Sequence, residues 1–376
     1  MNLVIYNINS FGGNYEYVQY LHRQYLLHPE VKSCTLLMPA NAIVGGANSK
    51  ILLSDICTSS NKWVRRFYFL YRSFINPFKL FKFLRNQPKS IVLFNDFDQP
   101  TANFWAPFFK LFRSHRFAVI LHDPDRDQFF PFKALSRFTM SSIMSFMDVA
   151  FYHGVLPDRP YYKGKFCKVK VPHGIYDNRE FNQAFLEEIL HQANGSAIVG
   201  VLGNIREEKN YEVIIESLKH LKHVKLLVAG QASNSGVSVG HYHELAAKFG
   251  VSEQIIWVDR YLDQHDFNAA IEACNIVLLY YKPSFTSQSG VLNSIATFHK
   301  MLIISNTESS LKDCVSAYNL GAIIPHSDVD QLTKTIVDLL EHNPKNLAQN
   351  WENYIREASW EKHVAIAVES YKQILG

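Results

Sequence analysis

The sequence predicts an α/β protein with two domains, each a doubly wound parallel sheet with helices on both faces. Three observations predict this fold class. Short, continuously apolar runs alternate with amphipathic helical patterns, the alternation restarts near residue 197, and a polar helical stretch ending at Asn194-Gly195 precedes the restart. Apolar runs between helices are typical of parallel strands that are buried on both faces. A chain of 376 residues is also long enough for two domains.

The predicted strands divide the chain into two Rossmann-like domains facing across a cleft, followed by a last helix. The first domain, 1–180, is predicted to contain strands at 3–9, 34–39, 90–96, 117–123, 148–154 and 168–174. The second domain, 197–355, is predicted to contain strands at 197–203, 224–230, 254–259, 276–281, 301–306 and 321–325. The last helix lies within 356–376. Ligands of open parallel sheets bind beyond the carboxyl ends of the strands, so functional residues are expected there.

The composition excludes several classes of protein. The net charge of +4 is mild, and the five cysteines are scattered, which favours a reducing compartment over a disulfide framework or a zinc site. The start, MNLVIYNINSFGGN, lacks the basic region and cleavage site of a signal peptide. No apolar run reaches the roughly 18 residues that a membrane span requires. These features predict a cytoplasmic protein.

Two loops of the second domain have the features of a diphosphate site. In GNIREEKN, 203–210, Arg206 and Lys209 lie at the start of a helix, where the helix dipole disfavours cations unless an anion is bound. Both side chains are expected to be exposed. In SFTSQSG, 284–290, Ser289 and Gly290 precede a helical run over 291–298, which would leave free N–H groups. The alternatives are solvated basic residues and a plain serine cap.

Four segments resemble the GT-B glycosyltransferases, specifically the large GT4-like group. GNIREEKN resembles the basic loop of that family, and VPHGIYD, 171–177, resembles the element that ends its first domain. FGGN, 11–14, resembles the family's glycine loop, and SWEKHVAIAVESYKQIL, 359–375, resembles the helix that crosses back to the first domain. The resemblance covers nearly the whole chain and implies the GT-B architecture.

This resemblance implies a nucleoside diphosphate sugar as donor, UDP- or GDP-linked, and no metal or other cofactor. Arg206 and Lys209 would hold the diphosphate and stabilise its growing charge. The implied donor-binding residues are Gly12, Gly13, Gly203, Asn204, Arg206, Lys209, Gly230, Ser287, Ser289, Gly290 and Asn293. We find no clear metal-ligand spacing, and HDPDRD is the only segment of the sequence that could be considered for one.

The sequence departs from the family at its paired glutamates. Phe285 and Asn293 stand where the family usually has Glu, so the usual retaining mechanism is in doubt. Asn293 can still bond a ribose hydroxyl. A base for an inverting transfer would then come from LHDPDRDQ, 121–128, with His122, Asp123 and Asp125 as candidates. The alternative is that Asp123 caps a turn and the other acids pair with Arg126.

Two basic, aromatic stretches predict a membrane-facing surface. Residues 62–86 and 103–116 combine aromatic residues with Lys and Arg and contain no acid. Trp63, Phe67, Leu70 and Phe74 fall on one helical face, and Pro77 is expected to begin a second helix. This pattern is typical of a helix lying in an anionic membrane interface. The alternative is a domain core with basic rims. Nucleic acid is not expected as a partner, because no nucleic-acid motif accompanies the pattern.

Together these features predict a peripheral enzyme on the inner face of the plasma membrane. It would move a hexose from a nucleotide sugar to a lipid-linked saccharide in bacterial polysaccharide or glycan synthesis. Two alternatives stay open: a catalytically degenerate subunit that binds a sugar nucleotide or a partner, and a GT-B nucleotide-sugar epimerase. An NAD-dependent oxidoreductase is excluded, because no strand is followed by G-x-G-x-x-G.

Overall fold

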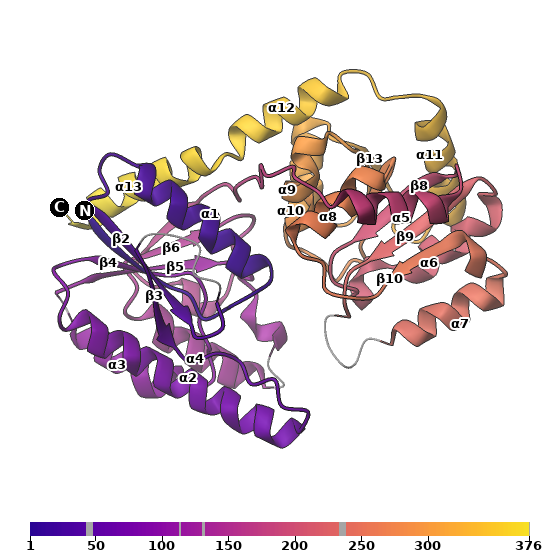
Figure 1. Cartoon of the computed structure of the whole chain (residues 1–376). Coiled ribbons are helices and arrows are strands. Elements are labelled where there is room, and N and C mark those ends of the chain that lie inside the picture. The colour runs from indigo at the N-terminus through magenta and orange to yellow at the C-terminus, as the bar shows by residue number, and fades with distance from the viewer. Residues whose placement is uncertain (43–47, 113, 130–131, 233–237, 376) are drawn as a thin grey trace. The chain divides into compact units, whose positions relative to one another are not determined.

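The computed structural model describes residues 1–42, 48–112, 114–129, 132–232 and 238–375 (Figure 1). The chain divides into two compact units. Unit 1 comprises Met1–Gly174 and Ala358–Gly376, and unit 2 comprises Ile175–Glu357. The last helix therefore belongs to the same unit as the first half of the chain.

Each unit contains one parallel sheet. Unit 1 has the strand order β3-β2-β1-β4-β5-β6-β7, formed by β1 (Asn2–Tyr6), β2 (Ser33–Pro39), β3 (Ser49–Leu53), β4 (Ile91–Phe94), β5 (Arg116–Leu121), β6 (Val149–Tyr152) and β7 (Cys167–Lys170). Unit 2 has the order β10-β9-β8-β11-β12-β13, formed by β8 (Ala197–Leu202), β9 (Val224–Ala229), β10 (Ile255–Val258), β11 (Ile276–Leu279), β12 (Met301–Ser305) and β13 (Ala322–Ile324). The strand pairs of both sheets are parallel.

The predicted fold class is confirmed, since both units are doubly wound. Strand order reverses direction between β1 and β4 and between β8 and β11, and ligands of such sheets bind at these switch points. All the predicted strands are present. The edge strand β3 was not predicted, because its residues Lys50 and Ile51 are exposed and it has no continuous apolar run.

Helices connect the strands. In unit 1 they are α1 (Gly13–Leu27), α2 (Lys62–Leu84), α3 (Ala102–Leu111), α4 (Lys133–Met144) and α13 (Trp360–Leu375). In unit 2 they are α5 (Gln183–Ala193), α6 (Tyr211–Ser217), α7 (Val239–Phe249), α8 (Gln264–Ala273), α9 (Gly290–Ile295), α10 (Ser310–Tyr318), α11 (Val329–Glu341) and α12 (Leu347–Glu357).

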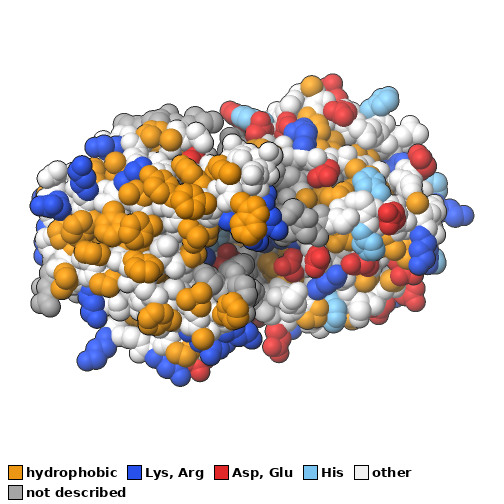
Figure 2. All heavy atoms as spheres, turned by 90° about the horizontal axis from the view of Figure 1, so that it is seen from below, with side chains coloured by type: hydrophobic (Ala, Val, Ile, Leu, Met, Phe, Trp, Pro, Cys, Tyr) orange, Lys and Arg blue, Asp and Glu red, His pale blue; other side chains and the backbone are white. Residues whose placement is uncertain are grey.

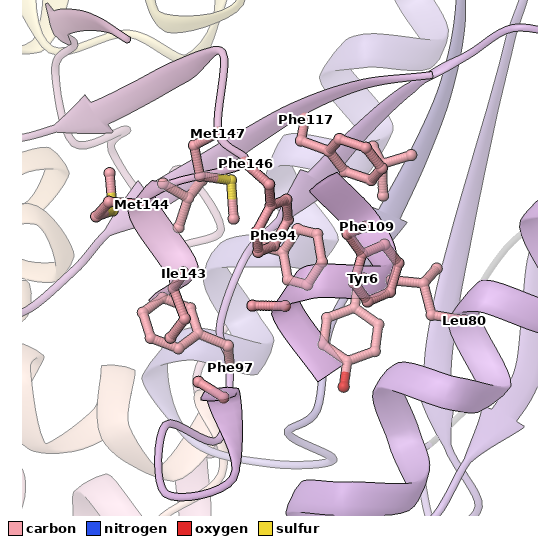
Figure 3. Close-up of a cluster of buried hydrophobic side chains, with 14 of the residues drawn as sticks. Tyr6, Leu80, Phe94, Phe97, Phe109, Phe117, Ile143, Met144, Phe146 and Met147 are labelled. Carbon is pink, nitrogen blue, oxygen red and sulfur yellow. The ribbon is translucent and has the colours of Figure 1, made fainter. Parts of the chain in front are cut away.

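Aromatic rings fill one side of the unit 1 core. Figure 3 shows Phe94 from β4, Phe109 from α3, Phe117 from β5 and Phe146 after α4 pointing into one cluster. The Phe109 and Phe146 rings stack with their centroids 5.4 Å apart, and Phe117 meets Phe146 edge to face at 5.3 Å. Such pairs add about 0.5–1.5 kcal/mol each beyond the area they bury. Part of the high phenylalanine content therefore serves packing.

Helix α2 is one continuous helix, so the prediction that Pro77 begins a second helix was wrong. Proline has no N–H and removes the helical bond to the carbonyl four residues earlier, which belongs to Ser73. Thr101 replaces that donor, because its hydroxyl donates to the Ser73 carbonyl oxygen at 2.7 Å. Asn61 caps the start of the helix, because its side chain accepts a hydrogen bond from the Trp63 N–H.

The segment VPHG fastens α13 to unit 1. A Cβ atom on Gly174 would lie 2.0 Å from the Trp360 ring, so only glycine allows this approach. His363 donates from Nδ1 to the Pro172 carbonyl at 2.8 Å, and the hydroxyls of Tyr25 and Tyr371 bond at 3.0 Å. The two hydrogen bonds join residues 191 and 346 positions apart in the chain.

Candidate active site

The loops after β8 and β9 approach each other through glycines. Gly203 has φ +81°, and a Cβ atom on Gly230 would lie 2.5 Å from the Gly203 carbonyl oxygen. A Cβ on Gly203 would in turn lie 3.2 Å from the side chain of Val291, which follows Gly290 in α9. The structure therefore brings together the two loops that the sequence predicted to hold a diphosphate.

Lys209 is buried, so the expectation that it is exposed was wrong. Its Nζ donates to the carbonyl oxygens of Leu202 and Gly203 at 2.5 and 2.8 Å. A 3-10 turn over Glu207–Lys209 and the left-handed backbone of Asn210 curl the side chain back under the end of β8. Burial, assisted by the Arg206 charge, lowers the pKa of Lys209 to about 7. Arg206 and Asn204 are exposed.

The loop after β11 carries an aromatic pair that the sequence analysis did not assign. Phe285 stacks on Tyr281 with the ring centroids 3.9 Å apart and the planes 13° from parallel. The Tyr281 hydroxyl bonds to the Ser289 hydroxyl at 3.0 Å, so Ser289 does not cap α9 with its side chain. The Lys282 N–H donates to the Glu208 carbonyl at 2.7 Å and ties this loop to the loop of Arg206. Ser287 is half-buried and Gly290 is exposed.

Asn293 is fully buried. Its side-chain oxygen accepts a hydrogen bond from the Tyr354 hydroxyl of α12. The side-chain oxygen of Asn293, which was expected to bond a ribose hydroxyl, is thus already engaged within the protein.

In unit 1, His122 follows β5 and belongs to a group of histidines. His122, His153 and His173 follow three neighbouring strands, and His363 comes from α13. The rings of all four lie 4.6 to 6.0 Å from the Tyr17 ring, measured between centroids. Within the described residues, no group of three or more His, Cys, Asp or Glu has the arrangement of a metal site.

Burial keeps these histidines neutral. It lowers the pKa of His122 to about 3, with Asp96 opposing the shift, and lowers the pKa values of His173 and His363 to about 4. Burial and the neighbouring histidines also bring the pKa of His153 well below its usual value. The unit 1 site thus contains uncharged imidazoles at neutral pH.

Asp96 is a charged residue of this site that was not assigned from the sequence. Its carboxylate accepts hydrogen bonds from Asn9 at 2.8 Å, Asn14 at 3.0 Å and the Phe97 N–H at 2.7 Å. Arg126 lies 3.6 Å away. Burial alone would raise the pKa of Asp96, but Arg126, His122 and the Asn9 bond hold it below its usual value.

Two acids of HDPDRD pair with arginines outside this segment. Asp125 accepts two bonds from Arg159, at 3.0 and 2.7 Å, and Asp127 accepts one from Arg137 at 2.9 Å. Arg126 pairs with Asp96 instead, so the alternative that these acids pair with Arg126 was wrong. Asp123 is half-buried and makes no ion pair within the described part of the chain. The two-pronged Arg159 contact engages both oxygens of the Asp125 carboxylate.

Gly12 and Gly13 form the turn into α1. Gly12 has φ +79° and its carbonyl accepts from the N–H groups of Tyr15 and Glu16, so a residue with a side chain would be strained there. A Cβ atom at either glycine would meet no other atom within 4 Å. The backbone at this turn is therefore open on the side where a side chain would lie.

Three neighbouring helices of unit 1, α2, α3 and α4, expose aromatic residues; α2 packs on α3 and α3 on α4. Figure 2 shows hydrophobic side chains gathered on one face of the molecule, with Lys and Arg around them. We call the exposed apolar face of these helices the aromatic surface. Its exposed members are Trp63, Val64, Phe67, Phe69, Leu70, Tyr71, Phe74, Phe104, Phe108, Leu111, Phe132, Leu135 and Phe138. Trp63 and Phe67 are 73% and 75% exposed, so the alternative that this helical face is a domain core was wrong.

Two details of the aromatic surface differ from the sequence analysis. The contribution of α4 was not predicted: its Leu135 and Phe138, and Phe132 at its N-cap, lie outside the stretches 62–86 and 103–116. Arg72 does not belong to the surface, since it is buried and donates to Asp98 at 2.9 and 2.6 Å. Residue 113, within the predicted stretch 103–116, lies outside the described residues. No helix in the described part of the chain has the length and apolarity to cross a bilayer.

The two doubly wound units, with a basic loop after the first strand of unit 2, have the GT-B architecture. Residues 182–358 match the family described as Glycosyl transferases group 1. The matched residues are a little under half of the chain and include nearly all of unit 2.

A curated relative resembles part of this chain, and solved structures share its fold. D-inositol 3-phosphate glycosyltransferase of Mycolicibacterium smegmatis is 22% identical over 179 residues, which are 47% of this chain and 40% of that protein. The match thus spans less than half of that relative. Sucrose-phosphate synthase from Thermosynechococcus elongatus is 13% identical with a TM-score of 0.72, covering 100% of this chain and 99% of that one. Anabaena Alr3699/HepE, in complex with UDP and glucose, is 12% identical with a TM-score of 0.72 over the same shares. These structures confirm the GT-B fold.

Proposed function

We propose that the protein transfers a hexose from a nucleoside diphosphate sugar, UDP- or GDP-linked, to a saccharide acceptor. The observation that carries this proposal is the contact between the two loops of unit 2, where Gly203 lies against both Lys209 and Val291. Arg206 is exposed beside them and would hold the diphosphate, while the loop amides around Ser289 and Gly290 share its charge. The structure of Anabaena Alr3699/HepE with UDP and glucose supports this choice of donor.

Unit 1 would bind the acceptor. His122 is our choice for the group that takes the proton of the acceptor hydroxyl, because Asp125 is held by Arg159. We infer that Asp123 and the turn at Gly12 and Gly13 border this site.

The acceptor is proposed to be lipid-linked, in bacterial polysaccharide or glycan synthesis. The aromatic surface supports this step: α2, α3 and α4 carry Lys and Arg but no Asp or Glu. Exposed aromatic residues beside Lys and Arg fit the interface of an anionic bilayer, and we therefore propose that the protein binds the inner face of the plasma membrane. An enzyme bound there would meet its acceptor at the membrane.

A second candidate function is favoured by one observation. Phe285 stands where the family has a glutamate, and its ring is committed to the stack on Tyr281. A subunit that binds the sugar nucleotide without turning it over would fit this change.

Calorimetric titration with a panel of UDP- and GDP-sugars, followed by assays for nucleoside diphosphate release with and without lipid-linked saccharides, tests both functions. We expect one donor to bind and to be turned over with an acceptor. Arg206→Ala should weaken binding of that donor, whereas Lys248→Ala, which removes an exposed lysine on α7, should not. Binding without release would favour the second candidate, and no binding of any donor would overturn both.

A further inference from the structure

The Asn95 side chain lies at the end of β4, within 3.2 Å of His122 Nε2. The sequence analysis assigned no role to Asn95. Its amide is fully buried and makes three hydrogen bonds within unit 1. A buried amide with all its groups engaged holds a defined orientation.

Two backbone carbonyls fix that orientation. Asn95 Nδ2 donates to the Asn14 carbonyl at 3.1 Å and to Asn7 Oδ1 at 3.1 Å. Asn7 Nδ2 in turn donates to the Asn9 carbonyl at 2.7 Å, so its oxygen faces Asn95. A backbone carbonyl can only accept, so neither amide can be reversed without losing these bonds.

The orientation of Asn95 decides the tautomer of His122. The Asn95 oxygen faces His122 Nε2 and can only accept, so Nε2 must carry the proton. In the neutral ring Nδ1 then has the lone pair. Within the described residues no hydrogen bond engages Nδ1, and the His122 ring is partly exposed.

We propose that Asn95 is a positioning residue that holds His122 as the Nε2–H tautomer, so that Nδ1 is the atom that receives the acceptor's proton. This inference rests on the proposed glycosyl transfer. The acceptor hydroxyl would give its proton to Nδ1 as its oxygen bonds to the anomeric carbon. The bond from that carbon to the diphosphate breaks, and the diphosphate leaves with the electron pair.

The surroundings suit a group that becomes charged only during the reaction. Asp96 attracts the imidazolium that forms, whereas Arg126 and His173 and His363 act against it. His153 and the edge of Tyr17 complete the groups around the ring. An imidazolium next to a fixed carboxylate is the arrangement expected for a base that must return its proton.

Nitrogen NMR on protein with ¹⁵N-labelled histidine tests the tautomer without any activity. We expect His122, assigned by the loss of its signals in His122→Asn, to carry its proton on Nε2 at pH 7. A proton on Nδ1 in the wild-type protein would overturn the inference. The tautomer is measured on the wild-type protein, and the variant serves only to assign the His122 signals.

The kinetic arm uses Asn95→Ala with Asn7→Ala as the matched control. Asn95→Ala should leave His122 as a mixture of both tautomers. It should lower kcat by about 10²-fold, which is near the rate contribution of a positioned general base, and leave the KM for the donor unchanged. Asn7→Ala removes one partner of Asn95 but leaves the Asn14 carbonyl, so it should keep the tautomer and most of kcat. An unchanged tautomer and kcat in Asn95→Ala would contradict the proposal. A wild-type protein with no turnover would instead refute the proposed function, while the NMR result would stand.

Discussion

Lys209 Nζ donates to the carbonyl oxygen of Gly203 at 2.8 Å, beneath the end of β8. Together with the bond from Nζ to the Leu202 carbonyl at 2.5 Å, it gives this lysine two partners inside the protein before any ligand arrives. A diphosphate bound here would be a third partner for an ammonium that is already held in place. The same burial lowers the pKa of Lys209 to about 7, and this has a measurable consequence.

Donor binding should take up protons between about pH 7 and 9. The free protein has Lys209 partly neutral at pH 7, and a bound diphosphate favours the charged form. Affinity should therefore weaken as pH rises above 7, by up to about tenfold per unit. Calorimetry in buffers of different ionisation enthalpy measures the proton uptake. Lys209→Arg, which stays charged, should bind without uptake, and equal uptake in both proteins would exclude Lys209 as the source.

Arg206→Ala and Lys209→Ala should separate function from stability. Arg206 is exposed, so its loss should change the free energy of unfolding by no more than about 0.5 kcal/mol and lower turnover on the order of 10²-fold. Lys209→Ala leaves two carbonyls without their donor and should destabilise by about 1–3 kcal/mol as well. Thermal unfolding and donor kinetics on both variants check this. Wild-type turnover in both would remove the diphosphate assignment.

The protein should bind anionic liposomes at low salt. Each Lys or Arg near the bilayer contributes roughly 1 kcal/mol, and salt screens this attraction. Changing Trp63, Phe67 and Phe74 to Ser should abolish cosedimentation, because these side chains are exposed on the aromatic surface. Leu190→Ser, at an exposed apolar residue of unit 2, is the control and should bind normally. If wild-type protein stays in the supernatant with vesicles rich in phosphatidylglycerol, the aromatic surface has another partner.

Unit 1 should lose stability steeply between pH 6.5 and about pH 4. The four histidines have pKa values lowered by burial, so the unfolded chain binds protons in this window and the folded chain does not. Stability then rises with pH and falls on acidification, by on the order of 1.4 kcal/mol per histidine per pH unit. Urea unfolding at several pH values measures the slope. His153→Gln should reduce it, whereas the exposed His220→Gln in unit 2 should not.

Asp125→Asn and His122→Asn should differ in their effect on transfer. Asp125 is held by Arg159 at a partly exposed site, so its neutralisation should cost less than about 1 kcal/mol and leave kcat within a few-fold. His122→Asn should lower kcat by about 10²- to 10⁴-fold. A larger loss of kcat in Asp125→Asn than in His122→Asn would reverse the assignment of the base.

The same enzyme should invert the anomeric configuration. With Phe285 in place of the glutamate, a single displacement by the deprotonated acceptor would turn an α-linked donor into a β-linked product. Anomeric proton couplings in the product give the answer. An α product from an α donor would show retention and remove the need for a base in unit 1.

The sequence alone predicted the fold class, the strand positions and the two loops of unit 2. These features depend on local patterns: apolar runs, helical periodicity, and glycine or polar residues directly after strands. The GNIREEKN loop could be found in this way because its residues are neighbours in the chain. The exposed face of α2 was predictable from periodicity as well.

Tertiary structure decided the partners of the charged and polar residues. Asn95 meets His122 across 27 positions, Asp125 meets Arg159 across 34, and Asp96 meets Asn9 across 87. Helix α2 continues through Pro77 because a threonine on another segment supplies the missing donor. Lys209 points inward because the end of β8 presents two carbonyls to it. Local sequence gives no information on such pairs, because the distance between two side chains is set by the packing of strands and helices far apart in the chain.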